Sequence, residues 1–143
     1  MIYNALDIAK YIINYEHSLK REISNLRLQK ILYFVQVKFL VTTNKPCFSD
    51  NIEAWAFGPV VAAVYHKYKI YGSLDIFEET TPIFIDKSTI NLMNNILESC
   101  ALYPTYQLVE ITHNQDTWKN AYSKGSGSII TQESIIKYFK KSA

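Results

Sequence analysis

Four side chains of this sequence could take part in acid–base chemistry, and they fall in two segments. Glu53 and Glu110 are candidate carboxylates, while His113 and Asp116 are spaced as a base and a group that orients it. The chain has no nucleophile elbow, no glycine loop that would cradle a phosphate and no HExxH pair. We therefore expect His113 to end a helix and bond a backbone group, and we do not expect an enzyme. Hydrolysis is the alternative.

The cysteines and histidines do not form a metal-binding pattern. Cys47 and Cys100 stand far apart, and the histidines (His17, His66 and His113) are scattered, so no pair has the spacing of zinc ligands. Without a recognisable secretion signal, two free and buried thiols are expected rather than a disulfide. The sequence therefore predicts no metal and no cofactor.

The segment "YHKYKIYG" (residues 65–72) interleaves lysines with tyrosines, a mixture that can stack on single-stranded nucleic acid. Helical spacing, however, sends Tyr65 and Tyr68 inward and leaves only a thin basic edge. The net charge is +2, and the chain has only two arginines, the residue that most often reads base edges. We therefore favour core packing for these tyrosines and do not expect a nucleic-acid partner.

Composition indicates one globular domain over residues 1–143. Hydrophobic residues make up 48% of the chain and charged residues 20%, and this length can bury a core without disulfides or metals. No apolar run approaches the roughly 20 residues of a membrane span. Asp7 and Lys10 interrupt the apolar start, which also lacks a small-residue cleavage site. We therefore expect a cytoplasmic protein without a membrane partner.

Two helices are predicted at the start of the chain. Asn4 can cap a helix over residues 5–17, and Ser24 can cap a second one over residues 25–42. The second helix is apolar nearly all round, which is typical of a central element. Three residues are expected in its narrow polar strip: Gln29, Gln36 and Lys38.

An extended arm and another helix occupy the middle of the sequence. Residues 47–57 ("CFSDNIEAWAF") alternate like a short strand. Gly58 is expected in a turn, and Pro59 at the first position of a helix that Gly72 ends. Residues 81–85 ("TPIFI") could form a further brief strand.

The remainder of the chain adds more helices. Asp86 or Ser88 opens one, Thr105 begins the next, a short one follows near residues 117–122, and Thr131 caps the last. A Gly/Ser loop, "KGSGS", precedes the last helix. We therefore predict a mainly α fold, a single compact helical domain of about six helices with one or two short strands.

Several segments, taken in order, resemble the Panacea domain of SocA-like antitoxins and of GepA-like genetic-element-associated proteins. The segments are "ALDIAKYII", "LRLQKILYFVQ", "PCFSDNIEAWAFGPVVAAVYHKYKIYG", "LVEITHNQDTW" and "ITQESIIKYF", which together cover nearly the whole chain. The motif residues that carry the resemblance are Lys30, Tyr33, Glu53, Trp55, Gly58, Pro59, His113 and Trp118.

The resemblance implies a helical protein of bacteria, phages, prophages or other mobile genetic elements that acts as the antitoxin of a two-gene pair. Its partner would be a protein toxin encoded by the adjacent gene and neutralised by direct protein–protein binding. One branch of the family also delivers its toxin to a cytoplasmic protease, so a protease is a further implied partner. The alternative is a phage or mobile-element inhibitor of a host defence enzyme with the same fold.

We expect the motif residues to be mainly structural, with Trp118 largely buried. A protein-binding surface needs a few aromatic or long-chain anchors within a polar rim. The outward side of the helix predicted after Pro59 fits this description best, although an ordinary solvated helix face is the alternative. The expected partner-binding residues are His66, Lys67, Lys69, Ile70 and Tyr71.

Overall fold

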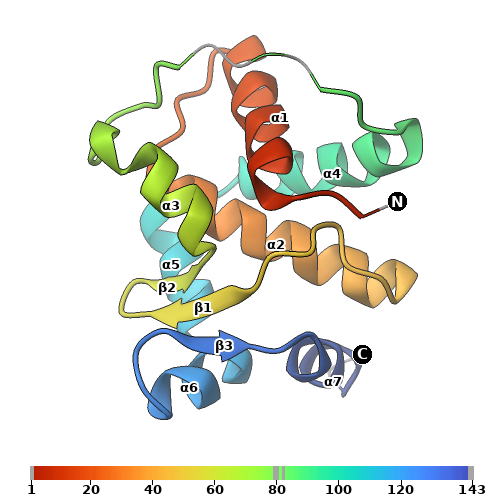
Figure 1. Ribbon diagram of the computed structural model, residues 1–143, viewed down its shortest axis with the longest axis vertical. Coiled ribbons are helices and arrows are strands. Elements are labelled where there is room, and N and C mark those ends of the chain that lie inside the picture. Colours follow the sequence, from red (N-terminus) through yellow and green to blue (C-terminus); the bar gives the residue numbers. More distant parts are fainter. Residues whose placement is uncertain (1, 79–80, 82, 142–143) are drawn as a thin grey trace.

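A computed structural model describes residues 2–78, 81 and 83–141, and within these it shows seven α-helices, one short 3-10 helix and three strands (Figure 1). In chain order they are α1 (Ala5–Ser18), α2 (Asn25–Thr43), β1 (Ile52–Trp55), β2 (Gly58–Val60), α3 (Ala62–Tyr68), η1 (Lys69–Tyr71), α4 (Lys87–Cys100), α5 (Thr105–His113), α6 (Asp116–Ser123), β3 (Ser128–Ile130) and α7 (Gln132–Lys141). The predicted mainly α fold is confirmed, with one helix and one strand more than expected.

Helix α2 is the central element, as its sequence predicts. In Figure 1 it crosses the middle of the molecule, with α1 and α4 on one side and the small sheet, α6 and α7 on the other. It contacts α1, α3, α4, α5, α7 and β2. Apolar side chains along its whole circumference are therefore buried, including Leu28, Ile31, Leu32 and Val35.

The polar strip predicted on α2 is wrong for two of its three residues. Lys38 is exposed, but Gln29 and Gln36 are buried. The Gln36 side chain donates to the carbonyl of Phe48 at 2.8 Å, and its oxygen accepts from the N–H of Cys47 at 2.8 Å. Backbone groups buried in a loop need partners, and this glutamine supplies them where no strand or helix can.

Local capping signals are confirmed by the structure. The Asn4 side chain accepts from the N–H of Asp7 at 2.8 Å, and that of Ser24 accepts from the N–H of Arg27 at 3.2 Å. Thr131 does the same for Ser134 at the start of α7, at 3.1 Å. Each bond spans only three residues, which is why sequence alone can predict it.

The region around Pro59 differs from the prediction. Strands β1 and β2 form an antiparallel hairpin in which Ala54 faces Pro59, and α3 begins only at Ala62. Strand β3 pairs with the other edge of β1, Ile52 facing Ile130, and gives the sheet order β2-β1-β3. Pro59 therefore belongs to a strand, and β3 follows the Gly/Ser loop where no strand was expected.

The strand predicted at residues 81–85 is wrong for the residues that the structure describes. Residues 81 and 83–85 are not in a strand, and residue 82 lies outside the described part.

Both cysteines are free and buried, as predicted. Burial raises the pKa of the Cys47 thiol to about 12 and that of Cys100 to about 11. Both thiols are therefore protonated near neutral pH and behave as small apolar side chains in the core.

Two buried tyrosines differ in how their hydroxyl groups are satisfied. The Tyr33 hydroxyl donates to the side-chain oxygen of Gln115 at 2.5 Å and lies 2.7 Å from the Thr117 hydroxyl. The Tyr68 hydroxyl is buried without a hydrogen-bond partner among the described residues, and burial raises its pKa to about 12. The Tyr33 hydroxyl therefore ties α2 to the start of α6, whereas Tyr68 contributes through its ring, which packs in the core and lies beneath the Lys67 amine.

Removing each hydroxyl group should have opposite consequences. Tyr33→Phe leaves the buried Gln115 and Thr117 groups unpaired and should destabilise the protein by about 1–3 kcal/mol. Tyr68→Phe removes an unpaired buried hydroxyl and should leave stability unchanged or raise it by up to about 1 kcal/mol. Urea unfolding with matched m values measures both differences. Equal losses in the two variants would contradict these assignments.

Candidate functional site

A lysine lies in the core beneath the hairpin. The Lys30 side chain is 0% exposed, and its Nζ donates to the carbonyl oxygen of Pro59 at 2.6 Å. Burial lowers the pKa of this amine to about 7. Desolvation is the cause, because an ammonium group loses its hydration in the core. Lys30 therefore anchors β2 directly to the central helix.

Gly58 sits against the same lysine in a backbone conformation that other residues avoid. Its φ is +111°, and a Cβ atom there would lie 2.9 Å from the Thr112 Oγ1 and 3.0 Å from the Lys30 Cε. Both distances are too short for ordinary contacts. The close approach of β2 to α2 and α5 thus requires glycine at this position.

Two aromatic residues from α5 and α6 hold the other side of the hairpin. The Trp118 indole N–H donates to the carbonyl of Trp55 at 2.8 Å, and His113 Nε2 donates to the carbonyl of Ala56 at 3.0 Å. The His113 and Trp118 rings lie 4.3 Å apart, and Trp118 stacks on Tyr122 at 4.9 Å. His113 therefore ends α5 and bonds a backbone group, as expected.

Trp118 is only partly buried, contrary to the expectation that it would be largely buried. It lies in α6, where one side packs against the core and the rings of His113 and Tyr122 flank it. Its indole N–H nevertheless has a backbone partner, which is the usual arrangement for a tryptophan with one side toward solvent.

The residues considered for acid–base chemistry take separate positions. His113 bonds the Ala56 carbonyl, while Asp116 is exposed in the first turn of α6. Glu53 accepts from the indole N–H of Trp55 at 3.0 Å, and Glu110 is exposed on α5. In the part of the chain that the structure describes, no three His, Cys, Asp or Glu side chains gather as a metal site would require, and no helix is long and apolar enough to cross a membrane.

Helix α3 is anchored to α2 by a chain of buried amides. The Gln29 oxygen accepts from the N–H of Val61 at 2.9 Å, and its nitrogen donates to Asn25 at 2.9 Å. Asn25 in turn donates to the carbonyl of Tyr65 at 3.0 Å. The start of α3 is therefore fixed relative to the hairpin, although no side chain caps this helix.

A groove of about 480 Å³ separates the hairpin from α3, and we call it the hairpin–α3 groove. Its lining includes Leu26, Trp55, Phe57, Tyr65 and Lys69. The Trp55 and Tyr65 rings form its floor, edge to face with centroids 4.9 Å apart. Phe57, in the two-residue turn between β1 and β2, is 68% exposed at one rim. In Figure 1 this turn and η1 project on the same side of the molecule.

The five predicted partner-binding residues do not share one face. Lys69 lines the groove, His66 lies beside the Trp55 ring with centroids 6.2 Å apart, and Ile70 is 85% exposed. Lys67 and Tyr71 instead engage Glu78, the lysine by an ion pair of 3.1 Å and the tyrosine by a hydrogen bond of 3.1 Å.

Sequence reasoning missed Phe57 as a surface residue, because the alternation of the extended arm assigned it to the same side as Trp55. A two-residue turn ends that alternation at Trp55. The available signal was the Gly-Pro pair directly after Phe57, since Gly and Pro favour turns and a turn there ends the strand before Phe57.

The buried amine predicts a pH dependence of stability. In the folded protein the Lys30 pKa is about 7, against 10.5 ordinarily. The unfolded chain therefore binds more protons between these values, and stability should rise with pH through this window. Relative to Lys30→Met, the parent should gain about 1–2 kcal/mol between pH 7 and 8.5. Chemical unfolding at each pH measures this, with exposed Lys119→Met as control. Parallel profiles for the parent and Lys30→Met would refute the assignment.

Substitution of Gly58 should disturb the hairpin. Gly58→Ala introduces a Cβ against Lys30 and Thr112 at positive φ and should cost about 2–3 kcal/mol of unfolding free energy. Gly72, which also has positive φ but open space around it, is the matched control. Gly72→Ala should cost less, about 1–2 kcal/mol, because it meets backbone strain without a clash. Thermal melts of both variants test this, and equal losses would show that the close approach is unimportant.

Comparison with known proteins identifies the family. The family model described as "Antitoxin SocA-like, Panacea domain" matches residues 28–119. This range is narrower than the resemblance expected from the sequence, but it contains all eight motif residues and the hairpin–α3 groove residues named above from Trp55 onward.

A curated relative, "Antitoxin SocA" of Caulobacter vibrioides (strain NA1000 / CB15N), is 39% identical over 69 residues. The alignment covers 48% of this chain and 37% of that protein, so the chain matches little more than a third of the relative's length. No solved structure matches the chain. Since the family model spans more than half of the sequence, the chain belongs to the SocA-like antitoxin family that is defined by the Panacea domain.

Proposed function

We propose that this protein is an antitoxin that neutralises a protein toxin by direct binding, and that the hairpin–α3 groove is the main contact surface. Family membership supports the role. The contact surface is inferred from two exposed apolar side chains: Phe57, which lines the groove at the hairpin turn, and Ile70 in η1, which follows the groove residue Lys69 in the chain. In the proposed system the adjacent gene encodes the toxin, the complex forms in the cytoplasm, and a cytoplasmic protease can receive the bound toxin.

The exposed anchors suit a protein partner for an energetic reason. Aromatic and large aliphatic side chains that become desolvated at the centre of an interface dominate its affinity. Each such side chain contributes roughly 1.5–3 kcal/mol when fully buried. Phe57 and Ile70 are both largely in water in the free protein, so nearly all of this contribution is available to a partner.

Rigidity of the surface strengthens the proposal. The hairpin turn is held from three directions, by Lys30 under Pro59 and by His113 and Trp118 on the carbonyls of Ala56 and Trp55. Because the backbone of the turn is already fixed, little backbone conformational entropy is lost when a partner binds the side chains of the turn.

The charge at the groove is positive, since Lys69 is its single charged lining residue among those described. An acidic rim on the toxin would therefore be complementary.

A double substitution tests the surface. Phe57→Asp with Ile70→Asp places two charges where a partner would desolvate them and should abolish rescue of growth when the protein is co-expressed with the adjacent gene's product. Lys67 is left unchanged, because reversing its charge would break its ion pair with Glu78. The fold should persist, with the melting temperature within a few degrees of the parent's, since both residues are exposed.

The matched control carries the same charge change elsewhere. Phe84 and Leu102 are each 79% exposed and lie outside the groove, so Phe84→Asp with Leu102→Asp should leave rescue intact. Full rescue by the Phe57/Ile70 variant would move the contact surface away from the groove. If the adjacent gene's product is harmless and unbound by the parent protein, the antitoxin role itself fails, and inhibition of a host defence enzyme becomes the better explanation.

A further inference from the structure

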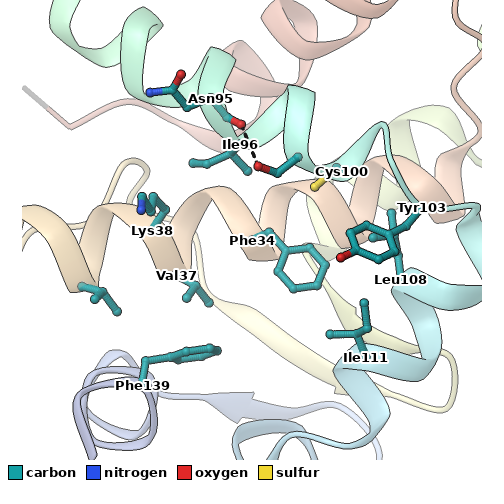
Figure 2. A pocket seen from close by; sticks show the side chains of 12 residues that line it. Phe34, Val37, Lys38, Asn95, Ile96, Cys100, Tyr103, Leu108, Ile111 and Phe139 are labelled. Carbon is teal, nitrogen blue, oxygen red and sulfur yellow. Dashed lines mark hydrogen bonds between the residues drawn. The ribbon is translucent and has the colours of Figure 1, made fainter. Parts of the chain in front are cut away.

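A second, more apolar groove lies on the side of α2 that faces α4, α5 and α7 (Figure 2). We call it the α2–α4 groove. Its volume is about 450 Å³. Figure 2 shows Phe34 and Val37 along α2, Ile96 above them on α4, Ile111 on α5 and Phe139 on α7, all directed toward the same hollow. None of these side chains belongs to the hairpin–α3 groove.

The walls of the groove are built from two helical stripes. On α2 the lining residues are Phe34, Val37, Lys38 and Val41, which are spaced i, i+3, i+4 and i+7. On α4 they are Asn95, Ile96, Ser99 and Cys100, of which Ile96 and Cys100 are buried while the polar Asn95 and Ser99 are exposed, and Tyr103 lies just beyond the helix end. Neighbouring helices usually fill the space between such stripes with their own side chains. Here the side chains of α2 and α4, together with Ile111 of α5 and Phe139 of α7, surround a hollow that the protein itself does not fill.

The groove is open to solvent, which bears on the kind of occupant. Phe34, Val41, Ile111 and Phe139 are only partly buried. A small apolar molecule in an open trough would keep one side in water. An amphipathic helix would place its apolar face in the groove and keep its polar face in water. The apolar residues of such a helix repeat with the same i, i+3, i+4 and i+7 spacing as the α2 residues that line the groove.

Charge at the groove favours an acidic residue on that helix. Lys38 is exposed and is the single charged side chain among the twelve lining residues. Arg27, near the far end, is already engaged, donating to the carbonyls of Cys100 at 2.8 Å and Tyr103 at 2.9 Å. An acidic residue one turn from the apolar anchors would therefore meet Lys38 at the rim.

We propose that the α2–α4 groove binds an amphipathic helix of the protein partner, with its apolar face between α2 and α4 and an acidic residue at Lys38. That the partner is a toxin rests on the proposed function, whereas the affinity of the groove for such a helix does not. The hairpin–α3 groove and the α2–α4 groove would then contact two separate parts of one partner.

A pair of model peptides tests the groove without any toxin. Each is a hydrocarbon-stapled helix of about 14 residues, because short free helices are marginal in water. Both carry Leu at i, i+3, i+4 and i+7, and they differ only in having Glu or Lys beside that stripe. The Glu peptide should shift the NMR signals of the Val37, Val41 and Ile111 methyl groups and bind roughly three- to tenfold tighter than the Lys peptide.

Charge reversal on the protein completes the test. Lys38→Glu should invert the preference between the two peptides, while Lys119→Glu, on the exposed side of α6, should leave it unchanged. Absence of methyl shifts with both peptides overturns the proposal, and so does a preference that Lys38→Glu fails to alter. Shifts produced by decanoate but by neither peptide would identify a small-amphiphile site instead.

The complex with the adjacent gene's product separates this inference from the proposed function. If the complex forms and the same three methyl groups shift, the groove is occupied by the partner. A complex that forms while these signals stay unchanged overturns the assignment of the partner's helix to this groove and leaves the antitoxin role standing. Failure of any complex to form refutes the antitoxin role, and the peptide result then decides the groove by itself.

Discussion

The amine of Lys30 lies in the core of the protein, and the carbonyl oxygen of Pro59 is its hydrogen-bond partner. Placing a titratable group in the core is costly unless a partner is held in position. The geometry that holds Pro59 also brings the backbone of Gly58 so close that a side chain there would strike Lys30 and Thr112. This contact fixes β2 against α2, and together with the bonds from His113 and Trp118 it sets the path of the hairpin and the position of Phe57.

The same principle extends along α2. This helix is buried on nearly every side, and its buried polar residues bind the segments that cross it, whereas Lys38 faces water. Gln36 holds the loop before β1, Gln29 holds the start of α3, and Tyr33 reaches the start of α6. Buried hydrogen bonds of this kind are costly to break, because each lost partner leaves an unsatisfied group. They therefore fix where the surface elements lie.

Fixed surface elements give a physical basis for partner binding. The hairpin–α3 groove presents the exposed aromatic side chain of Phe57 on a rigid turn, and the α2–α4 groove is lined mainly by apolar side chains. An interface that uses both grooves would be larger than one that uses a single groove. Such a protein could bind partners that differ in the region that contacts one of the two grooves. A small domain could in this way bind proteins of different structure while keeping its own core unchanged.

The sequence by itself determined most of the helices, the caps of α1, α2 and α7, the central place of α2 and the two buried thiols, because these depend on bonds within one turn or on apolar periodicity. Family membership was also readable from the order of the motif residues, and the matching family model confirms it.

Only the tertiary structure decided the role of Pro59, the existence of β3 and the exposure of Phe57. Strand β3 pairs with β1 across more than 70 residues, Ile52 with Ile130, and no local pattern encodes such a pairing. Lys67 and Tyr71, which are predicted to contact a partner, both bind Glu78, and the course of the loop that carries Glu78 is not specified by the sequence. Contacts between distant segments depend on where α2 places them, so residue types alone could not predict this part of the candidate site.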